Sequence, residues 1–128
     1  MFEVPKRDRR LKNKAEVLAL TFPEHSEETL AISAAFLNKN RIYTDRIGDL
    51  SFVVLTDESG ASRVYETQGR RFERWDSDKA ATDQDGVQWT LHEDRLESAA
   101  GDRLARLPAH RAFWFGWYAA YPDTRLVR

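Results

Sequence analysis

Three histidines are the side chains of this sequence best suited to metal binding, and His25, His92 and His110 lie far apart along the chain. None of them belongs to an HxH, HxxxH or HExxH pattern, which would place two ligands side by side. His92 is followed directly by Glu93 and Asp94, and it could bind a metal together with a more distant ligand. A polar turn between two strands explains the same residues, and we favour it. The sequence therefore predicts no metal site and no cofactor, and leaves His92 as the one candidate ligand.

His110 is the candidate general base, because it lies at the start of a strongly aromatic segment that could form a pocket. Asp85 or Glu93 would be its acidic partner in a small hydrolase or lyase. A histidine in such a place more often packs the edge of its ring against the core. Other signatures are missing, since the chain has no cysteine and no GxSxG, GxGxxG or GxxxxGK motif. We therefore predict no catalytic residue, and keep the His110 enzyme as an alternative.

An acidic stretch at residues 76–86 invites comparison with a calcium-binding loop. Its aspartates are Asp76, Asp78, Asp83 and Asp85. They lack the fixed spacing of oxygen ligands and the closing glutamate of an EF-hand. We interpret the stretch as a solvated loop with a turn at Asp85–Gly86.

Aromatic side chains are the remaining functional signal, at 12% of the chain. This is more than one small core plainly needs, and we predict that Trp89, Phe115 and Trp117 line a groove for a small molecule or a protein partner. Packing in the core is the competing interpretation for the whole set. Phe115 points away from the other rings of its segment, so its face could pair with a second copy or with a sister domain.

The element that must position several of these residues is the segment 107–121, LPAHRAFWFGWYAAY. Helical spacing places His110, Trp114 and Trp117 on one side of it. Pro108 would suit the first turn, where its missing N–H is no loss. We predict that this helix closes the core, because each ring left in water would forfeit roughly 1.5–3 kcal/mol of burial.

Most of the remaining chain has the pattern of β-strands. We predict strands at 15–22, 29–33, 50–56, 62–67, 72–75, 87–92 and 95–98, a short helix at 34–40 and an extended tail at 123–127, with 41–47 ambiguous. The unbroken apolar run at 50–56 indicates a central strand. The fold class is α+β: an antiparallel sheet, which could close in part into a barrel, covered by the aromatic C-terminal helix and by the short helix near residue 34.

Length and charge limit the domain organisation and the partners. At 128 residues we expect one α+β domain, residues 15–128, preceded by a basic N-terminal arm at residues 1–14. The 20 basic and 21 acidic side chains nearly cancel, and no aromatic residue is interleaved with the charges of the arm, so we do not expect a nucleic-acid partner. No apolar run approaches the roughly 20 residues of a membrane span, and the start lacks a signal peptide. This leaves the compartment open: cytoplasmic if the chain is complete, extracytoplasmic if it belongs to a longer exported protein.

The C-terminal segment resembles the ending of DUF3179, a prokaryotic family of unknown function. The family pattern is Leu-Pro, a spacer, Phe-Trp-Phe-x-Trp, an aromatic residue, Pro, an acidic residue and Thr. The matching residues here are Leu107, Pro108, Phe113, Trp114, Phe115, Trp117, Tyr121, Pro122, Asp123 and Thr124. Upstream, Asp85, Gly86 and Trp89 match part of the family's D-x-x-TGS-x-W segment, and residues 45–66 resemble its central hairpin.

The resemblance implies an uncharacterised domain, because the family has no known activity to transfer. Longer members have two related halves, and this chain is similar to the second. Many members are exported or membrane-anchored, and their Cys-Pro-Leu-Cys-Gly segment has no counterpart here. We therefore predict a non-catalytic binding or interaction module with an aromatic groove. The alternatives are the His110 hydrolase or lyase, and a structural half-domain that pairs with a sister domain.

Overall fold

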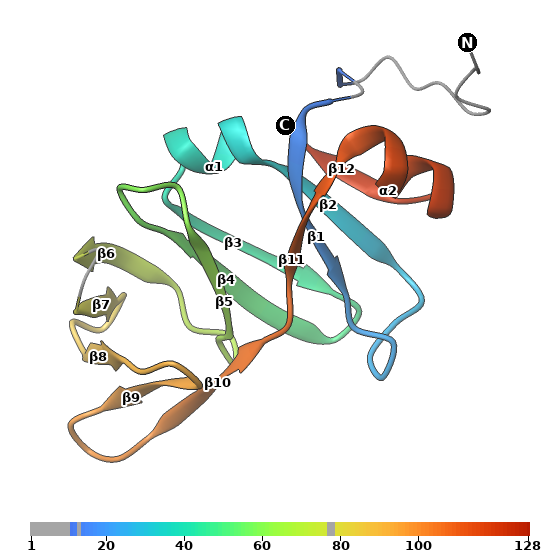
Figure 1. The fold of residues 1–128 in the computed structure, drawn as a ribbon. Helices are drawn as coiled ribbons and strands as arrows, with labels where there is room; N and C mark the ends of the chain where they lie inside the picture. The colour runs from blue at the N-terminus through green and yellow to red at the C-terminus, as the bar shows by residue number, and fades with distance from the viewer. Residues whose placement is uncertain (1–10, 13, 77–78) are drawn as a thin grey trace, which may run out of the picture.

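The computed structural model describes residues 11–12, 14–76 and 79–128, and these form two β-sheets and two short helices (Figure 1). The larger sheet contains β3 (Ile42–Ile47), β4 (Leu50–Thr56), β5 (Ser62–Glu66), β6 (Phe72–Asp76), β7 (Ala80–Asp83), β8 (Gln88–Leu91), β9 (Arg95–Ser98) and β10 (Arg103–Leu107). The smaller sheet contains β1 (Glu16–Thr21), β2 (Thr29–Ser33), β11 (His110–Phe113) and β12 (Arg125–Val127). The helices are α1 (Ala34–Lys39) and α2 (Trp114–Ala120). The predicted α+β fold class is confirmed.

The larger sheet curls into a nearly closed barrel. Its strands follow the order β3-β4-β5-β10-β9-β8-β7-β6, and neighbours pair antiparallel throughout. The two end strands, β3 and β6, come close together. A sheet that closes on itself leaves little unpaired edge, and its inward side chains must fill the interior. The prediction of a partly closed barrel is therefore confirmed.

Strand β4 shows how the barrel packs against the smaller sheet. Because side chains alternate along a strand, Phe52 and Val54 point to a core shared with Leu20 of β1, whereas Val53 and Leu55 point into the barrel. All five side chains are buried. A strand that is buried on both faces is apolar on both, which explains the unbroken apolar run in the sequence and confirms its central position.

The smaller sheet is built on the predicted hairpin of β1 and β2. Strand β11 pairs antiparallel with β1, and β12 pairs in parallel with β2. Figure 1 shows the chain passing from β10 in the barrel into β11 in the smaller sheet, with Pro108 and Ala109 between them. The short helix α1 begins where predicted, since the hydroxyl of Ser33 accepts a hydrogen bond from the N–H of Phe36. The ambiguous segment 41–47 is strand β3.

The predicted helix 107–121 is wrong over its first half. Helix α2 begins only at Trp114, and His110–Phe113 is a strand whose residues pair with β1, His110 opposite Ala19. The cause is tertiary: hydrogen bonding along the free edge of β1 outweighs the helical spacing of the rings. Pro108 consequently lies between two strands and not in a first helical turn.

The aromatic helix does cover a core, as predicted, although only two of its rings are deeply buried. Trp114 and Trp117 are 1% and 6% exposed and pack with Val17, Ala19 and Ala31 of the smaller sheet. Among the described residues, neither helix is long and apolar enough to cross a membrane.

The polar stretch 76–86 is also not the continuous loop that its composition predicts. Strand β7 occupies Ala80–Asp83, and the small side chain of Ala81 packs against Trp89 inside the barrel. Asp78 of the calcium candidate lies outside the described residues, as do residues 1–10 and 13 of the basic arm.

Candidate functional site

The residues of the alternative enzyme are not brought together. His110 lies exposed on β11, with its ring edge-on to Trp117 at 5.5 Å between centroids. Asp85 lies in the turn between β7 and β8, and Glu93 lies in the turn between β8 and β9. Both turns belong to the barrel, whereas β11 belongs to the smaller sheet. The geometry gives His110 the packing role that the sequence left as its alternative.

His92 lies in a polar turn. Its N–H donates to the carbonyl of Arg95, and its own carbonyl accepts the hydroxyl of Tyr65 at 3.2 Å. Among the described residues, no group of three or more acidic or histidine side chains could hold a metal ion. The observed hydrogen bonds of His92 are made by its backbone, at the end of the barrel.

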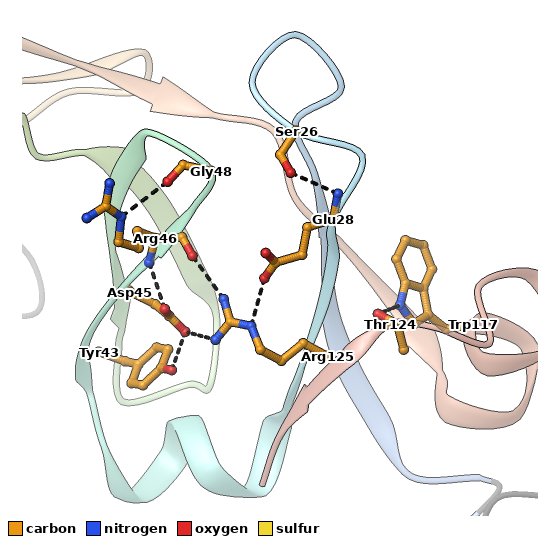
Figure 2. Close-up of polar contacts among 9 residues, drawn as sticks. All are labelled: Ser26, Glu28, Tyr43, Asp45, Arg46, Gly48, Trp117, Thr124 and Arg125. Carbon is orange, nitrogen blue, oxygen red and sulfur yellow. Dashed lines mark hydrogen bonds and ion pairs between the residues drawn. The ribbon is translucent and has the colours of Figure 1, made fainter.

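Trp89, Phe115 and Trp117 do not share a groove. Trp89 is 1% exposed inside the barrel, whereas Trp117 packs beneath α2 on the smaller sheet. Phe115 is exposed on α2. The indole N–H of Trp117 donates to the hydroxyl of Thr124 at 3.0 Å, and this buried bond ties the chain after α2 back to the helix (Figure 2).

Asp83 holds Trp89 in place. One carboxylate oxygen accepts the indole N–H of Trp89 at 3.0 Å, and the other accepts the N–H groups of Asp85 and Val87. Burial raises the pKa of this carboxyl, but the hydrogen bonds outweigh it, so the pKa lies below its ordinary value. Sequence reasoning counted Asp83 among solvated loop acids. The signal it missed was Asp-x-x-Gly shortly before a tryptophan, because Gly86 takes the left-handed conformation that completes the turn.

One feature with the geometry of a binding site is a depression of about 300 Å³ at one end of the barrel, which we call the barrel mouth. Its lining comprises Thr44, Asp45, Arg46, Ser51, Thr67, Gly69, Arg70 and Arg71. Alternation along the strands explains the arrangement: Arg46 lies opposite Ser51, and the N–H of Thr67 donates to the Ser51 carbonyl. Arg46, Ser51 and Thr67 lie on the same inward face of the barrel as Val53 and Tyr65, one step nearer to its end. The mouth is thus the polar continuation of the apolar interior.

The hydroxyl of Thr67 is the unusual group at the mouth. Thr67 is fully buried, and its hydroxyl has no hydrogen-bond partner among the described residues. A buried hydroxyl without a partner destabilises a fold by about 1–3 kcal/mol. Such groups are rare in folded proteins, and each of them requires an explanation.

Three arginines give the mouth a positive rim. The guanidinium of Arg70 lies over the ring of Trp89, 5.1 Å from its centroid. Arg46 donates from Nε to the carbonyl of Gly48 at 3.2 Å, and Arg71 is exposed beside Arg70. Cations concentrated around a concave polar surface attract anions.

Asp45 is the one acidic residue of the lining, and its side chain bonds to residues outside the mouth. Figure 2 shows Arg125 reaching from β12 to donate to Asp45 at 2.7 Å, to Glu28 at 2.8 Å and to the carbonyl of Arg46 at 2.9 Å. Tyr43 donates to the same Asp45 carboxylate at 2.6 Å. Burial raises the pKa of Asp45, but these hydrogen bonds, together with one from the N–H of Arg46, outweigh it and hold the pKa below its ordinary value. The ion pair between Asp45 and Arg125 joins the two sheets, and Arg125 offsets the negative charge of Asp45.

A family model described as a protein of unknown function, DUF3179, matches residues 1–124. The chain belongs to this family. No curated protein matches it, and no solved structure does either.

The residues behind the resemblance to DUF3179 have structural roles in this chain. Trp117 and Thr124 bond to each other, and Trp89 bonds to Asp83 beside the Asp85–Gly86 turn. Both motifs pair a buried indole N–H with a side-chain oxygen, which satisfies a group that would otherwise be costly to bury. The segment 45–66, which resembles the family's central hairpin, contributes Asp45, Arg46 and Ser51 to the mouth.

Proposed function

We propose that the protein is a non-catalytic binding module whose small ligand binds at the barrel mouth. The observation that carries this proposal is the buried Thr67 hydroxyl, which has no partner among the described residues and belongs to the lining of a concave polar surface. A bound ligand would supply the missing hydrogen bond and remove the cost of burying the hydroxyl.

The surroundings of Thr67 support the proposal. Small-molecule sites are concave, largely preformed, and are found in the mouths of β-barrels. Here the floor is rigid, because Ser51 and Thr67 are tied together by a ladder hydrogen bond of 3.0 Å. The separation of His110 from Asp85 and Glu93 favours binding over the hydrolase or lyase alternative. The proposed site thus replaces the predicted aromatic groove. Of the predicted rings, Trp89 lies behind the mouth, under the guanidinium of Arg70.

A thermal-shift screen of small metabolites tests the proposal. We expect hits that raise the melting temperature of the wild-type protein and lose most of this effect in Thr67→Val and Ser51→Ala. Thr82→Val, at a half-buried position in β7 outside the lining, is the matched control and should keep the effect. Hits that stabilise Thr67→Val as much as the wild type would place the ligand elsewhere and contradict the proposal.

A second candidate function, pairing through the Phe115 face, is supported by the exposure of three rings. Phe113, Phe115 and Tyr121 are 53%, 37% and 42% exposed on one short segment. Exposed rings of this size are typical of surfaces that contact another protein. Light scattering at high concentration tests self-association: the wild type should form dimers, and Phe115→Ser should not. A wild type that stays monomeric would contradict pairing between copies.

A further inference from the structure

We propose that the ligand group bound at the barrel mouth is a phosphate, held by Arg70 and Arg46 at the rim and by the hydroxyls of Ser51 and Thr67 at the floor. This inference rests on the proposed function and assigns the chemical class of its ligand. Guanidinium groups bind phosphate through paired, charge-assisted hydrogen bonds, and hydroxyls complete the set of donors.

The turn after β5 aims Arg70 at the mouth. Gln68 and Gly69 have φ angles of 52° and 86°, and the N–H of Arg70 donates to the carbonyl of Thr67 at 3.1 Å. Left-handed backbone is uncommon for a residue with a side chain, and it recurs where a tight turn must place a functional group. The turn carries the chain straight from the floor residue Thr67 to the rim residue Arg70. The two donors therefore belong to one short turn between β5 and β6.

The nearby acids cancel only part of the positive charge at the mouth. Asp45 lies between Arg46 and Thr44 in the sequence, so its side chain points to the opposite face of β3. It bonds there to Arg125 and Tyr43. The charge of Asp83 interacts with Arg70, and the charge of the exposed Asp49 interacts with Arg46. Three guanidinium groups line the depression against these two carboxylates, and the remaining positive charge attracts an anion such as phosphate.

Trp89 provides a direct signal for this binding. The guanidinium of Arg70 lies 5.1 Å from the centroid of its ring, so a phosphate that draws Arg70 toward itself changes the field on the indole. The indole N–H bonds to Asp83 and reports this change as a shifted resonance. Trp75, Trp114 and Trp117 lie in other environments and serve as internal references.

The test is a titration of the full chain with inorganic phosphate, at constant ionic strength set with chloride, followed by two-dimensional NMR of backbone and indole N–H groups. We expect saturable shifts at Ser51, Thr67 and Arg70 and at the Trp89 indole. Arg70→Gln and Arg46→Gln should each weaken binding about tenfold, as expected for the loss of one charge-assisted contact. Arg74→Gln, an exposed arginine of β6 outside the lining, should bind like the wild type.

Neutral and carboxylate probes separate the two levels of the proposal. Glucose, glycerol and acetate are titrated in parallel with phosphate. Saturable shifts at the mouth with a neutral sugar or with acetate, but none with phosphate, would overturn the phosphate assignment and leave the binding module standing. An absence of shifts at the mouth with every probe, together with a metabolite screen that yields no Thr67-dependent hit, would overturn both. Equal phosphate affinity in Arg70→Gln, Arg46→Gln and the wild type would also overturn the assignment.

Discussion

The two ends of the barrel differ in how their polar groups are satisfied. At the end away from the mouth, Trp75 donates to the carbonyl of Thr56 at 2.9 Å, and Tyr65 donates to the carbonyl of His92 at 3.2 Å. The hydroxyls of Thr56 and Ser62 bond to each other at 2.8 Å. At the mouth, the Thr67 hydroxyl has no partner among the described residues, and arginines surround it. One end is closed by internal hydrogen bonds, and the other contains a buried hydroxyl that lacks a partner among the described residues.

This difference separates stability from binding within one sheet. Polar groups that bond to each other lower the free energy of the folded state, whereas a buried group without a partner raises it. An end that is closed internally has nothing left to offer a ligand. We therefore expect substitutions at the closed end to change stability, and substitutions at the mouth to change binding.

The largest expected effect comes from Trp89, which belongs to the core shared by both ends. Trp89→Ala should lower the free energy of unfolding by about 3–5 kcal/mol, because it leaves a cavity and removes the partner of Asp83. Urea denaturation followed by circular dichroism measures this. Trp75→Ala, at a half-buried indole of the closed end, serves as the comparison and should cost less. A loss below about 1 kcal/mol for Trp89→Ala would mean that the two ends do not share one core.

A matched pair of hydroxyl deletions tests the comparison itself. Tyr65→Phe should lower the free energy of unfolding by about 1 kcal/mol, because the carbonyl of His92 loses its donor. Thr67→Val should leave stability unchanged or raise it by up to about 1 kcal/mol, because it removes a buried hydroxyl that has no partner among the described residues. Chemical denaturation without added ligand measures both. The opposite order of effects would show that the Thr67 hydroxyl is already satisfied.

The pH dependence of Asp83, which lies outside the lining of the mouth, tests the internal hydrogen bonds that hold Trp89 in place. Its folded-state pKa lies below the ordinary value, so its contribution to stability is fully present above about pH 4, the pKa of an unfolded aspartate, and is lost as the pH falls through the folded value. Asp83→Asn should be less stable than the wild type by about 1–2 kcal/mol at pH 7. This gap should narrow as the pH falls below about pH 4. Thermal unfolding across this range measures it, and a gap that stays constant with pH would contradict the assigned hydrogen bonds.

The smallest effect is expected at His110, which lies outside both ends. His110→Ala should change the free energy of unfolding by less than about 0.5 kcal/mol, because the ring is exposed and only its edge meets Trp117. Phosphate binding at the mouth should be unaffected. The NMR titration measures this. If the phosphate-dependent shift of the Trp89 indole is lost in His110→Ala, the mouth and the C-terminal segment are not independent.

The strand content could be predicted because it depends on local alternation and apolar runs. Residues 29–33, 50–56 and 95–98 are strands as predicted, and 50–56 is central because both of its faces are apolar. Strand β7 and the first half of the predicted helix could not be found in this way. Ala80–Asp83 is too polar to read as a strand, and His110–Phe113 has helical spacing, yet both pair with neighbouring strands that are fixed elsewhere in the chain.

The candidate site was less predictable than the fold. The sequence predicted that aromatic rings form the binding surface. However, the rings of Trp89 and Trp117 are buried in the core, and their indole N–H groups bond to Asp83 and Thr124. Arg46, Ser51 and Thr67 carry no motif, because they come together only through the register of three strands. The extended tail was expected, but the contacts of Arg125 with Glu28 and Asp45 span 97 and 80 residues of sequence.

The sequence by itself determined that this chain forms an antiparallel, sheet-rich core with buried tryptophans, because side-chain alternation and hydrophobic burial act along every local stretch. Only the tertiary structure decided which polar groups would find partners and which would not. Hydrogen bonding depends on where two groups meet in space. When the barrel closes, the hydroxyl of Tyr65 finds a partner at one end, whereas the hydroxyl of Thr67 finds none among the described residues at the other, where three arginines line the mouth.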